Sequence, residues 1–186
     1  MNTVDLTIIM PTWNKEAYIR DALDSIFAQR TRFSYHIIVA DDNSTDSTLD
    51  IVQEYEKRHP GFFTVLTSDQ NRKLYRNVIR AYAITKTPYF CVLDPDDYWM
   101  SENHVENALS YLESHKKFSI YSSGIEMLYP DGTRKKCAFA NKPTISSFDD
   151  YLCDKAVIAF TQTCVFRNVV FINGLPEKMI HTKELQ

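Results

Sequence analysis

Short apolar segments alternate with amphipathic segments through residues 1–115, and this alternation constrains the fold more than any other feature of the sequence. The predicted strands are Leu6–Met10, Tyr35–Ala40, Phe63–Thr67 and Tyr89–Leu93. Between them apolar side chains recur at helical spacing, as Ile19, Leu23 and Ile26 do after the first strand. Strands separated by single helices need crossover connections, which make neighbouring strands parallel. The pattern therefore predicts an α/β fold with a mostly parallel central sheet flanked by helices.

The predicted helices begin after polar side chains that can cap them. Asn14 precedes the first helix, and Ser44 or Asp46 precedes the second. The third helix is predicted over residues 72–85, and Ser101 precedes the fourth.

Residues 116–186 have a less regular pattern. The expected elements are extended segments at 119–123, 125–129 and 134–139, a turn at 130–132, a short helix at 146–155, a strand at 163–167 and a helical turn at 168–172. We expect this part to be a smaller mixed α+β subdomain that closes over the ligand edge of the 1–115 half, within one domain overall. The last residues contain no stopping signal, which favours a chain truncated at its C-terminus.

Composition and charge exclude several classes of protein. The chain has 186 residues, of which 44% are hydrophobic and 24% charged, as in ordinary folded domains. Its net charge of -3 and pI of about 5.9 provide no basic face, so we expect no binding to nucleic acid. No apolar run reaches the ~18 residues of a membrane span, and the N-terminal run is too short for a signal peptide. We expect a cytoplasmic protein, with peripheral association at the inner face of the membrane left open.

The cysteines do not form a metal-binding or redox motif. Cys91, Cys137, Cys153 and Cys164 are widely spaced, and no C-x-x-C pair occurs. We expect free thiols, as in a reducing compartment.

Polar side chains cluster directly after three of the predicted strands. Residues 11–14 (PTWN) follow the first strand, 41–46 (DDNSTD) the second, and 94–97 (DPDD) the fourth. Because parallel strands present their carboxyl ends at one edge of a sheet, and ligands bind there, we expect the three loops to converge on one site.

The DPDD loop places three carboxylates within four residues. Asp94, Asp96 and Asp97 repel one another and raise each other's pKa unless a cation lies between them. Carboxylate oxygens are hard ligands suited to Mn²⁺ or Mg²⁺, which leave coordination positions for phosphate oxygens. This pattern favours a metal that carries a diphosphate. The alternative is a solvated acidic turn before the fourth helix.

The other polar positions also have two interpretations. Asp41 and Asp42 can accept hydrogen bonds from a base N–H or ribose hydroxyls, or they can cap the second helix. Trp13 offers a flat face for a nucleobase, although a loop tryptophan can also plug the core. Arg76 and its basic neighbours over 72–76 can meet a diphosphate, or they can form the solvated face of a helix.

Three segments together resemble the family-2 glycosyltransferases of the GT-A fold: IIMPTWNKEAYIRDALDSIFAQ, HIIVADDNSTDST and YFCVLDPDDYW. The family pattern is an apolar strand ending in P-T/S-aromatic-N, then V-D-D-x-S-x-D, then D-x-D-D at the fourth strand. The match covers residues 5–115, and VFRNVVFINGLPEKM resembles the segment before the family's acceptor-side acidic motif. The resemblance implies a GT-A type, Rossmann-like fold and a nucleotide-diphosphate sugar donor, most often UDP-linked. It further implies transfer with inversion to a saccharide or lipid-linked acceptor, in cell-surface polysaccharide biosynthesis.

The resemblance also implies roles for individual residues. The donor-nucleotide positions are Pro11, Trp13, Asn14, Asp41, Asp42, Arg76 and Asp94, and the metal positions are Asp96 and Asp97. In this pattern Trp13 and Asp42 hold the base, and Asp94 holds the ribose. Asp96 binds the Mn²⁺ or Mg²⁺ that bridges the two phosphates, with Asp97 in support. The metal neutralises the leaving diphosphate, while a carboxylate takes the proton of the attacking acceptor hydroxyl.

The general base is the one role without a matching motif. The family supplies it from an E-D pair shortly after a segment like 174–179, where this sequence offers Glu184. Glu184 is the predicted base, and the alternative is a base in residues beyond Gln186. In that case the chain is a nucleotide-sugar-binding module or an inactive fragment. A phosphoryl-transfer domain is disfavoured, since the sequence has neither D-x-D-x-T/V at the first strand nor G-x-x-x-x-G-K-S/T.

Overall fold

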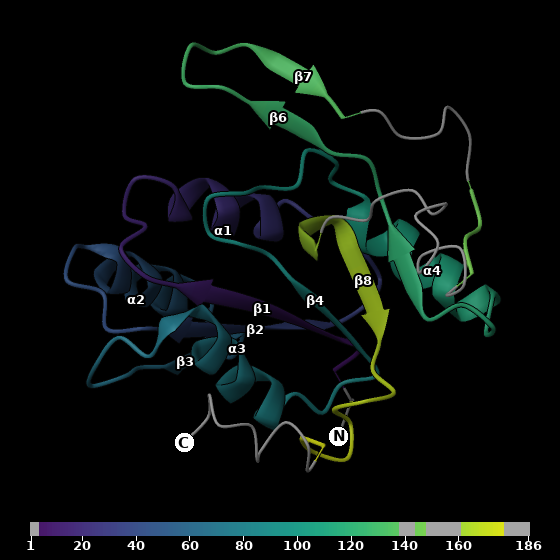
Figure 1. Ribbon diagram of the computed structural model, residues 1–186, viewed down its shortest axis with the longest axis horizontal. Helices are drawn as coiled ribbons and strands as arrows, with labels where there is room; N and C mark the ends of the chain where they lie inside the picture. The colour runs from purple at the N-terminus through teal and green to yellow at the C-terminus, as the bar shows by residue number, and fades with distance from the viewer. Residues whose placement is uncertain (1–3, 138–143, 148–160, 177–186) are drawn as a thin grey trace.

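The computed structural model describes residues 4–137, 144–147 and 161–176 (Figure 1). The strands are β1 (Leu6–Thr12), β2 (Tyr35–Asp41), β3 (Phe63–Leu66), β4 (Tyr89–Val92), β5 (Ile120–Ser122), β6 (Glu126–Leu128), β7 (Arg134–Lys136) and β8 (Cys164–Arg167). The helices are α1 (Ile19–Phe27), α2 (Thr48–Arg58), α3 (Lys73–Ile84), α4 (His104–Ser114) and the short 3₁₀ helix η1 (Thr161–Thr163).

Six of the strands form one sheet in the order β3-β2-β1-β4-β8-β5. β1 lies between β2 and β4 and is parallel to both, and β2 is parallel to β3. β8 is antiparallel to both β4 and β5. The predicted fold class, a mostly parallel sheet flanked by helices, is confirmed.

The second part of the chain contributes to the same sheet. β5 and β8 extend it beyond β4, whereas β6 and β7 pair with each other as a separate two-stranded hairpin (Figure 1). The division into 1–115 and 116–186 stays a prediction. The predicted boundary after residue 115 separates β4 from β5 and β8, although all three strands belong to one sheet.

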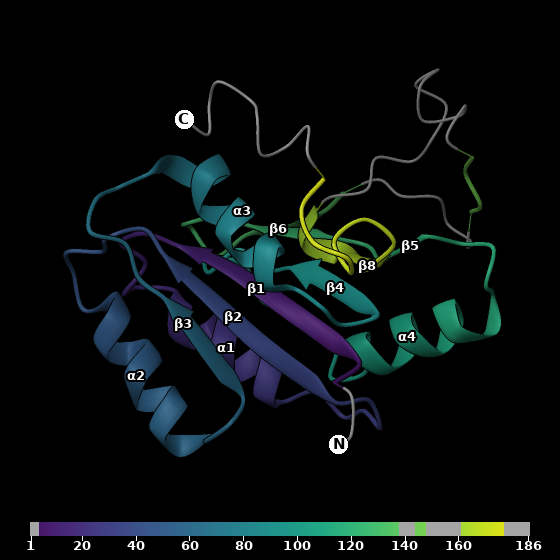
Figure 2. The ribbon, with the colours of Figure 1, turned by 90° about the horizontal axis from the view of Figure 1, so that it is seen from below.

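The two faces of the sheet are covered by different helices. Ile8 and Ile37 belong to the core cluster that also contains side chains of α1, α2 and α4. Ile9 and Ile38, one position further along each strand, belong to the cluster with α3 and Phe171 (Figure 2). Every residue of β1 is buried, which explains its continuous apolar run, because a central parallel strand has no solvated face.

The helix starts differ from the predicted ones. Asn14 does not cap α1, which begins at Ile19; its φ of 49° and its contacts belong to the loop instead. α2 begins at Thr48, and Asp46 Oδ1 accepts a hydrogen bond from Thr48 N at 3.0 Å. The capping prediction was therefore wrong for Asn14 and close for Asp46. The Asn14 side chain thus makes its contacts within the loops, whereas the Asp46 side chain holds the start of α2.

Two elements near the C-terminus were predicted to be helical, and the described residues of both are not. Residues 168–172 form bends and a turn rather than a helical turn, and Gly174 N donates to Phe171 O at 2.9 Å. Most of the predicted helix at 146–155 lies outside the described residues, and residues 146–147 are not helical. Phe171 nevertheless has a structural role, because its ring stacks on Tyr82 of α3 at 4.3 Å.

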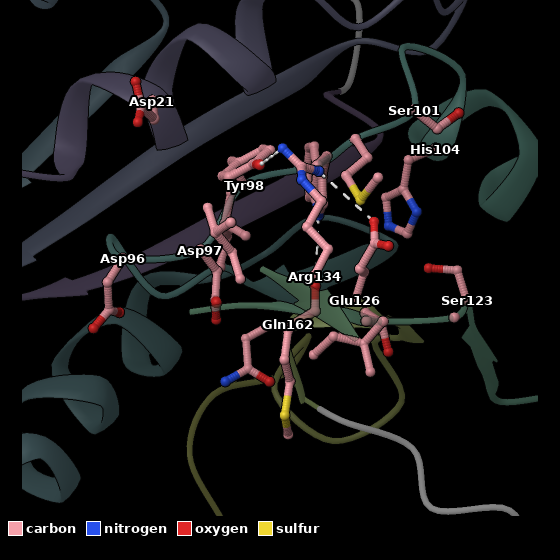
Figure 3. Close-up of a pocket in the computed structure, with 18 of the residues that line it drawn as sticks. Asp21, Asp96, Asp97, Tyr98, Ser101, His104, Ser123, Glu126, Arg134 and Gln162 are labelled. Atoms are coloured by element: carbon pink, nitrogen blue, oxygen red, sulfur yellow. Dashed lines mark hydrogen bonds and ion pairs between the residues drawn. The ribbon is translucent and has the colours of Figure 1, made fainter. Parts of the chain in front are cut away.

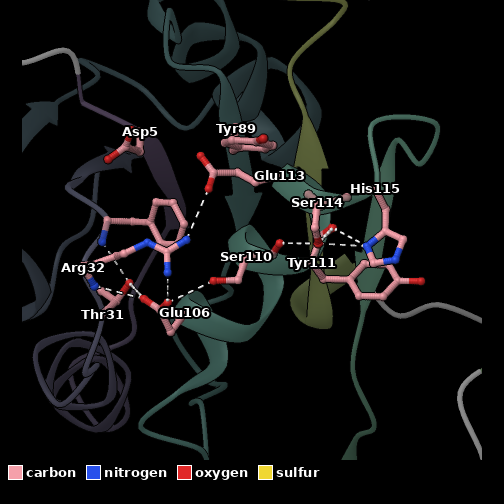
Figure 4. A network of polar contacts seen from close by, with 12 residues as sticks. Asp5, Thr31, Arg32, Tyr89, Glu106, Ser110, Tyr111, Glu113, Ser114 and His115 are labelled. Atoms are coloured by element: carbon pink, nitrogen blue, oxygen red, sulfur yellow. Dashed lines mark hydrogen bonds and ion pairs between the residues drawn. The ribbon is translucent and has the colours of Figure 1, made fainter.

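A polar network joins α4 to the segment before β2 (Figure 4). The Arg32 guanidinium donates to Glu106 Oε1 at 3.0 Å and to Glu113 Oε2 at 3.3 Å. The Arg32 backbone N and the Thr31 hydroxyl both donate to Glu106 Oε2. These contacts fix the helix that follows the DPDD loop and so help to fix that loop.

Cys91, Cys137 and Cys164 are free thiols, as predicted, and Cys153 lies outside the described residues. In the part of the chain that the structure describes, no helix combines the length and the apolar character that a bilayer crossing requires.

Candidate functional site

The loops after β1 and β2 are joined by side-chain hydrogen bonds at the carboxyl edge of the sheet. Asn14 N donates to Ser44 Oγ at 3.0 Å, and Thr45 N donates to Asn14 Oδ1 at 2.8 Å. Lys15 N donates to Thr48 Oγ1 at 2.7 Å. Asparagine tolerates the left-handed conformation that Asn14 adopts here. Asn14 is thus a loop-joining residue, and its contact with a nucleotide stays a prediction.

Asp42 joins the β2 loop to the start of α3. Its Oδ1 accepts from Arg72 N at 2.7 Å and its Oδ2 from Lys73 N at 2.8 Å. The side chain is buried, with 3% of the residue exposed. The first N–H groups of a helix lack partners within the helix, so a carboxylate here stabilises the helix start. The motif did not reveal this role, and the base-holding role of Asp42 stays a prediction.

Asp41 is buried as well, but only one of its oxygens is satisfied. Ser44 N donates to Asp41 Oδ2 at 3.1 Å. Asp41 Oδ1 has no hydrogen-bond partner among the described residues. A buried carboxylate oxygen without a partner costs free energy, which a donor from a ligand would recover.

Trp13 and Pro11 flank the end of β1. Pro11 is buried within the strand and lies opposite Ala40 of β2. Trp13 is 52% exposed, so it does not plug the core. Its neighbour Thr12 accepts a hydrogen bond from Asp42 N at 2.9 Å, which puts the start of the Trp13 segment beside the β2 loop. The indole is available for stacking.

The DPDD loop turns back on itself after β4. Asp97 N donates to Asp94 O at 2.9 Å, and Gln162 Nε2 of η1 donates to Asp94 Oδ2 at 2.9 Å. Burial raises the pKa of the Asp94 carboxyl, with the Gln162 hydrogen bond acting against this rise and the Asp96 charge adding to it. The pKa of Asp97 is also raised, first by burial and then by the charges of Asp96 and Asp94.

Asp96 is the more exposed member of the loop and lies against a cation. Its Oδ2 is 2.6 Å from Lys15 Nζ, so the loops after β1 and β4 meet through this pair. The three loops predicted to converge are therefore joined at one edge. Hydrogen bonds join the β1 and β2 loops, and this ion pair joins the β1 and β4 loops. A fully solvated turn would leave Asp94 and Asp97 exposed, whereas both are half-buried.

The loop residues fit a divalent cation held by few protein ligands. Among the described residues no group of three or more His, Cys, Asp or Glu side chains is arranged to hold a metal alone. Mg²⁺ is commonly held by one or two carboxylates, and substrate phosphates and water complete its coordination shell. The raised pKa values of Asp94 and Asp97 fit this arrangement, because a nearby dication would favour both ionised carboxylates. The donor set is oxygen only, as Mg²⁺ and Mn²⁺ prefer.

A cavity of about 680 Å³ lies between the DPDD loop and the β6–β7 hairpin (Figure 3). Its walls include the aromatic residues Tyr18, Tyr98, Trp99, Tyr121 and Tyr129, and the carboxylates of Asp21, Asp96, Asp97 and Glu126. Arg134 of β7 donates to Tyr98 OH at 3.3 Å and lies 3.7 Å from Glu126 Oε2. The hairpin was predicted, but its position over the acidic loop was not, because no local pattern specifies it.

His104 forms part of the wall of this cavity. It is 6% exposed, its ring lies 4.9 Å from that of Trp99, and its Nε2 has no partner among the described residues. Burial lowers the pKa of His104 to about 4, so the ring is neutral at physiological pH. The sequence analysis did not single out this residue.

Arg76 lies on the exposed side of α3, beside a second cavity of about 450 Å³. This cavity is lined by residues 70–73, 75 and 76, at the edge where Asp42 holds the helix start. The diphosphate contact predicted for Arg76 stays a prediction. Glu184, the predicted base, lies outside the described residues.

Solved glycosyltransferases have the same fold. The structure superimposes on S. aureus TarS 1-349 with a TM-score of 0.70 and 22% identity, over 97% of this chain and 52% of that one. The mannosyltransferase PcManGT from Pyrobaculum calidifontis, solved with GDP-Man and Mn²⁺, gives a TM-score of 0.66 at 18% identity, over 95% of this chain and 48% of that one.

Sequence comparison gives closer relatives. The putative teichuronic acid biosynthesis glycosyltransferase TuaG of Bacillus subtilis is 30% identical over 148 residues, which is 79% of this chain and 56% of TuaG. The curated relatives matched over two thirds or more of this chain are longer proteins, of which it spans between 37% and 56%. The model of the family described as Glycosyl transferase family 2 matches residues 7–171. The chain therefore belongs to glycosyltransferase family 2.

Proposed function

We propose that the chain is the donor-binding part of a metal-dependent, inverting glycosyltransferase. It would transfer a sugar from a nucleotide diphosphate, with UDP as the first candidate, to a saccharide or lipid-linked acceptor. We place this reaction in cell-surface polysaccharide biosynthesis, on the cytoplasmic side, either in solution or peripherally at the inner face of the membrane.

The observation that carries the proposal is the acidic loop at the carboxyl edge of the sheet. Asp94 and Asp97 have raised pKa values, and Asp96 forms an ion pair with Lys15 of the β1 loop. Such a group of carboxylates is stabilised by a dication, and a dication with free coordination positions attracts a diphosphate. When bound, the metal would neutralise charge on the leaving diphosphate.

The remaining donor contacts come from the neighbouring loops. The exposed Trp13 indole would stack on the base, and Asp41 and Asp42 would accept hydrogen bonds from the nucleoside. A carboxylate has about four lone-pair sites, so Asp42 can hold the start of α3 and still accept from a ligand. Asp94 would bind the ribose, and Arg76 would meet the diphosphate.

The cavity beneath the hairpin is the proposed acceptor site. It adjoins Asp96 and Asp97 and offers both aromatic faces and carboxylates, the combination that suits sugar rings and their hydroxyl groups. In the reaction an acceptor oxygen bonds to the anomeric carbon as the bond from that carbon to the phosphate oxygen breaks. The nucleoside diphosphate leaves with the electron pair, and a carboxylate base takes the hydroxyl proton. Glu184 is the proposed base.

The comparisons support the choice of donor and pathway. TarS has also been solved in complex with UDP-GlcNAc, and PcManGT with GDP-Man and Mn²⁺. TuaG is named for teichuronic acid biosynthesis, and a Shigella flexneri relative is named a dTDP-rhamnosyl transferase. These names include donors with three different bases, so the test must cover several nucleotides.

The test is a thermal-shift series with UDP, CDP, GDP and dTDP, each with Mn²⁺ or with EDTA. We expect stabilisation by one of the nucleotides only when the metal is present, and we expect Asp96→Asn to abolish it. Glu56→Gln is the matched control, since Glu56 is an exposed carboxylate in the C-terminal half of α2. No metal-dependent shift with any nucleotide would refute the proposal.

A second candidate is a nucleotide-sugar-binding module without transferase activity. It needs only the joined loops of the proposed donor site, which lie among the described residues. Both candidates predict the same thermal shift. Slow hydrolysis of the sugar nucleotide that is lost in Asp96→Asn would favour the enzyme, and binding without any turnover would favour the module.

A further inference from the structure

Lys15 provides the cation that faces the acidic loop. Its Nζ lies 2.6 Å from Asp96 Oδ2, with 31% of the lysine side chain and 44% of the aspartate side chain exposed. Among the described residues, no other Lys or Arg forms an ion pair with Asp94, Asp96 or Asp97. Asp96, whose Oδ2 forms the ion pair with Lys15, is the residue predicted above to bind the metal.

The backbone of Lys15 is fixed, so only its side chain can respond to a ligand. Its N–H donates to Thr48 Oγ1 at 2.7 Å, and Thr48 is fully buried. Its carbonyl accepts from Tyr18 N and Ile19 N, both at 3.0 Å, at the start of α1. The Lys15 ammonium therefore reaches the acidic loop from a backbone that is held in place by hydrogen bonds.

The charge of Lys15 acts on the whole loop and not on Asp96 alone. It opposes the rise in the pKa of Asp94 and of Asp97, although burial outweighs it in both cases. One ammonium thus serves as counter-ion to three carboxylates. A divalent cation at the same place would do this more effectively, but it would have to compete with Lys15 for Asp96 Oδ2.

We propose that Lys15 is a built-in competitor for the metal position, which weakens metal binding to the free protein and couples it to the arrival of the nucleoside diphosphate. The phosphate oxygens would accept the displaced ammonium and complete the coordination of the metal. Metal and nucleotide would then bind together rather than separately. The inference rests on the proposed function, since it takes the diphosphate as the second ligand.

The test is the affinity of the free protein for Mn²⁺, measured without nucleotide by the electron paramagnetic resonance signal of unbound Mn²⁺. For Lys15→Met we expect binding about tenfold tighter, because the variant removes both the competition for Asp96 and the repulsion between the ammonium and the dication. Lys15→Arg retains the charge and should bind Mn²⁺ like the wild type. Lys57→Met is the matched control, since it removes an exposed lysine from α2. Mn²⁺ affinity of Lys15→Met that equals the wild type, or falls below it, would overturn the proposal.

A second measurement separates this inference from the proposed function. UDP is added at saturation and the Mn²⁺ affinity is measured again. We expect UDP to tighten Mn²⁺ binding strongly in the wild type and much less in Lys15→Met. If UDP tightens Mn²⁺ binding equally in both proteins, the inference fails while the proposed metal-diphosphate site stands. If UDP has no effect on the wild type and the other three nucleoside diphosphates have none either, both fail.

Discussion

Gln162 Nε2 donates a hydrogen bond to Asp94 Oδ2 at 2.9 Å, across 68 positions of the sequence. Gln162 belongs to η1, directly before β8, and Asp94 follows the neighbouring strand β4. The antiparallel pairing of β8 with β4 brings the start of β8 to the carboxyl end of β4. A neutral amide thus supports one carboxylate of the acidic loop, and it opposes the rise in the pKa of Asp94.

Removal of this amide should weaken both ligand binding and the stability of the fold. In Gln162→Ala, Asp94 loses its donor, and a hydrogen bond to a charged group contributes about 1.5–3 kcal/mol. We expect the affinity for UDP with Mn²⁺ to fall about tenfold or more, measured by isothermal titration calorimetry. The melting temperature should fall as well, because Gln162 is half-buried and its bond to Asp94 is already present in the free protein.

Gln53→Ala, on the exposed face of α2, is the control for this substitution. An unchanged nucleotide affinity in Gln162→Ala would mean that the orientation of Asp94 is set by the loop backbone alone.

Asp42 should contribute to stability even without any ligand. In Asp42→Asn, one of the backbone N–H groups of Arg72 and Lys73 faces an amide NH₂ instead of a carboxylate oxygen. Loss of a side-chain partner at a helix start costs about 0.5–2 kcal/mol, and the buried position favours the upper end. Urea denaturation of the free protein measures this loss. A variant as stable as the wild type would show that the contact is not needed to hold α3.

The sequence predicted the part of the fold that depends on local pattern. β1, β2, β3 and β4 were all expected within two residues of their observed ends, because buried parallel strands are continuous apolar runs. The convergence of the polar loops followed from the parallel connections, since these place the carboxyl ends of the strands together.

The remaining features depend on contacts between distant segments. Asn14 was expected to cap α1 because it precedes an apolar helical pattern, but its side chain meets Thr45 across 31 positions. Gln162 and His104 carry no local signal at all, since only the pairing of β8 and the packing of α4 bring them to the site. Such contacts follow from the tertiary arrangement and cannot be obtained from periodicity.

Lys73 adopts a left-handed backbone conformation at the start of α3, with φ at 71°. Residues with a Cβ are strained in this region by about 1–2 kcal/mol, whereas glycine is not. We expect Lys73→Gly to raise the free energy of unfolding by about 0.5–1 kcal/mol, since the greater flexibility of glycine in the unfolded chain offsets part of the gain. Lys73→Ala keeps the Cβ and should give no such gain. Equal stability changes in the two variants would contradict the strain.

His104 should make the stability of the protein depend on pH between about 4 and 6.5. Burial lowers its pKa from the ordinary 6.5 to about 4, so the unfolded chain binds a proton in this range while the folded protein does not. The neutral ring therefore stabilises the fold fully above pH 6.5, and this contribution is lost progressively as the pH falls towards 4. A shift of this size corresponds to about 3 kcal/mol. His36, whose pKa burial also lowers, contributes in the same direction.

The contribution of His104 is isolated by comparison with His104→Phe. Phenylalanine cannot take up a proton and retains an aromatic ring beside Trp99. Urea denaturation of both proteins at intervals from pH 7 to pH 4.5 should give curves of stability against pH that diverge, with the wild type losing more as the pH falls. Because all other titrating groups are common to both proteins, their effects cancel in the difference. Parallel curves would mean that His104 is protonated as easily in the folded protein as in the unfolded chain, and that the ring is not held neutral in the wall of the cavity.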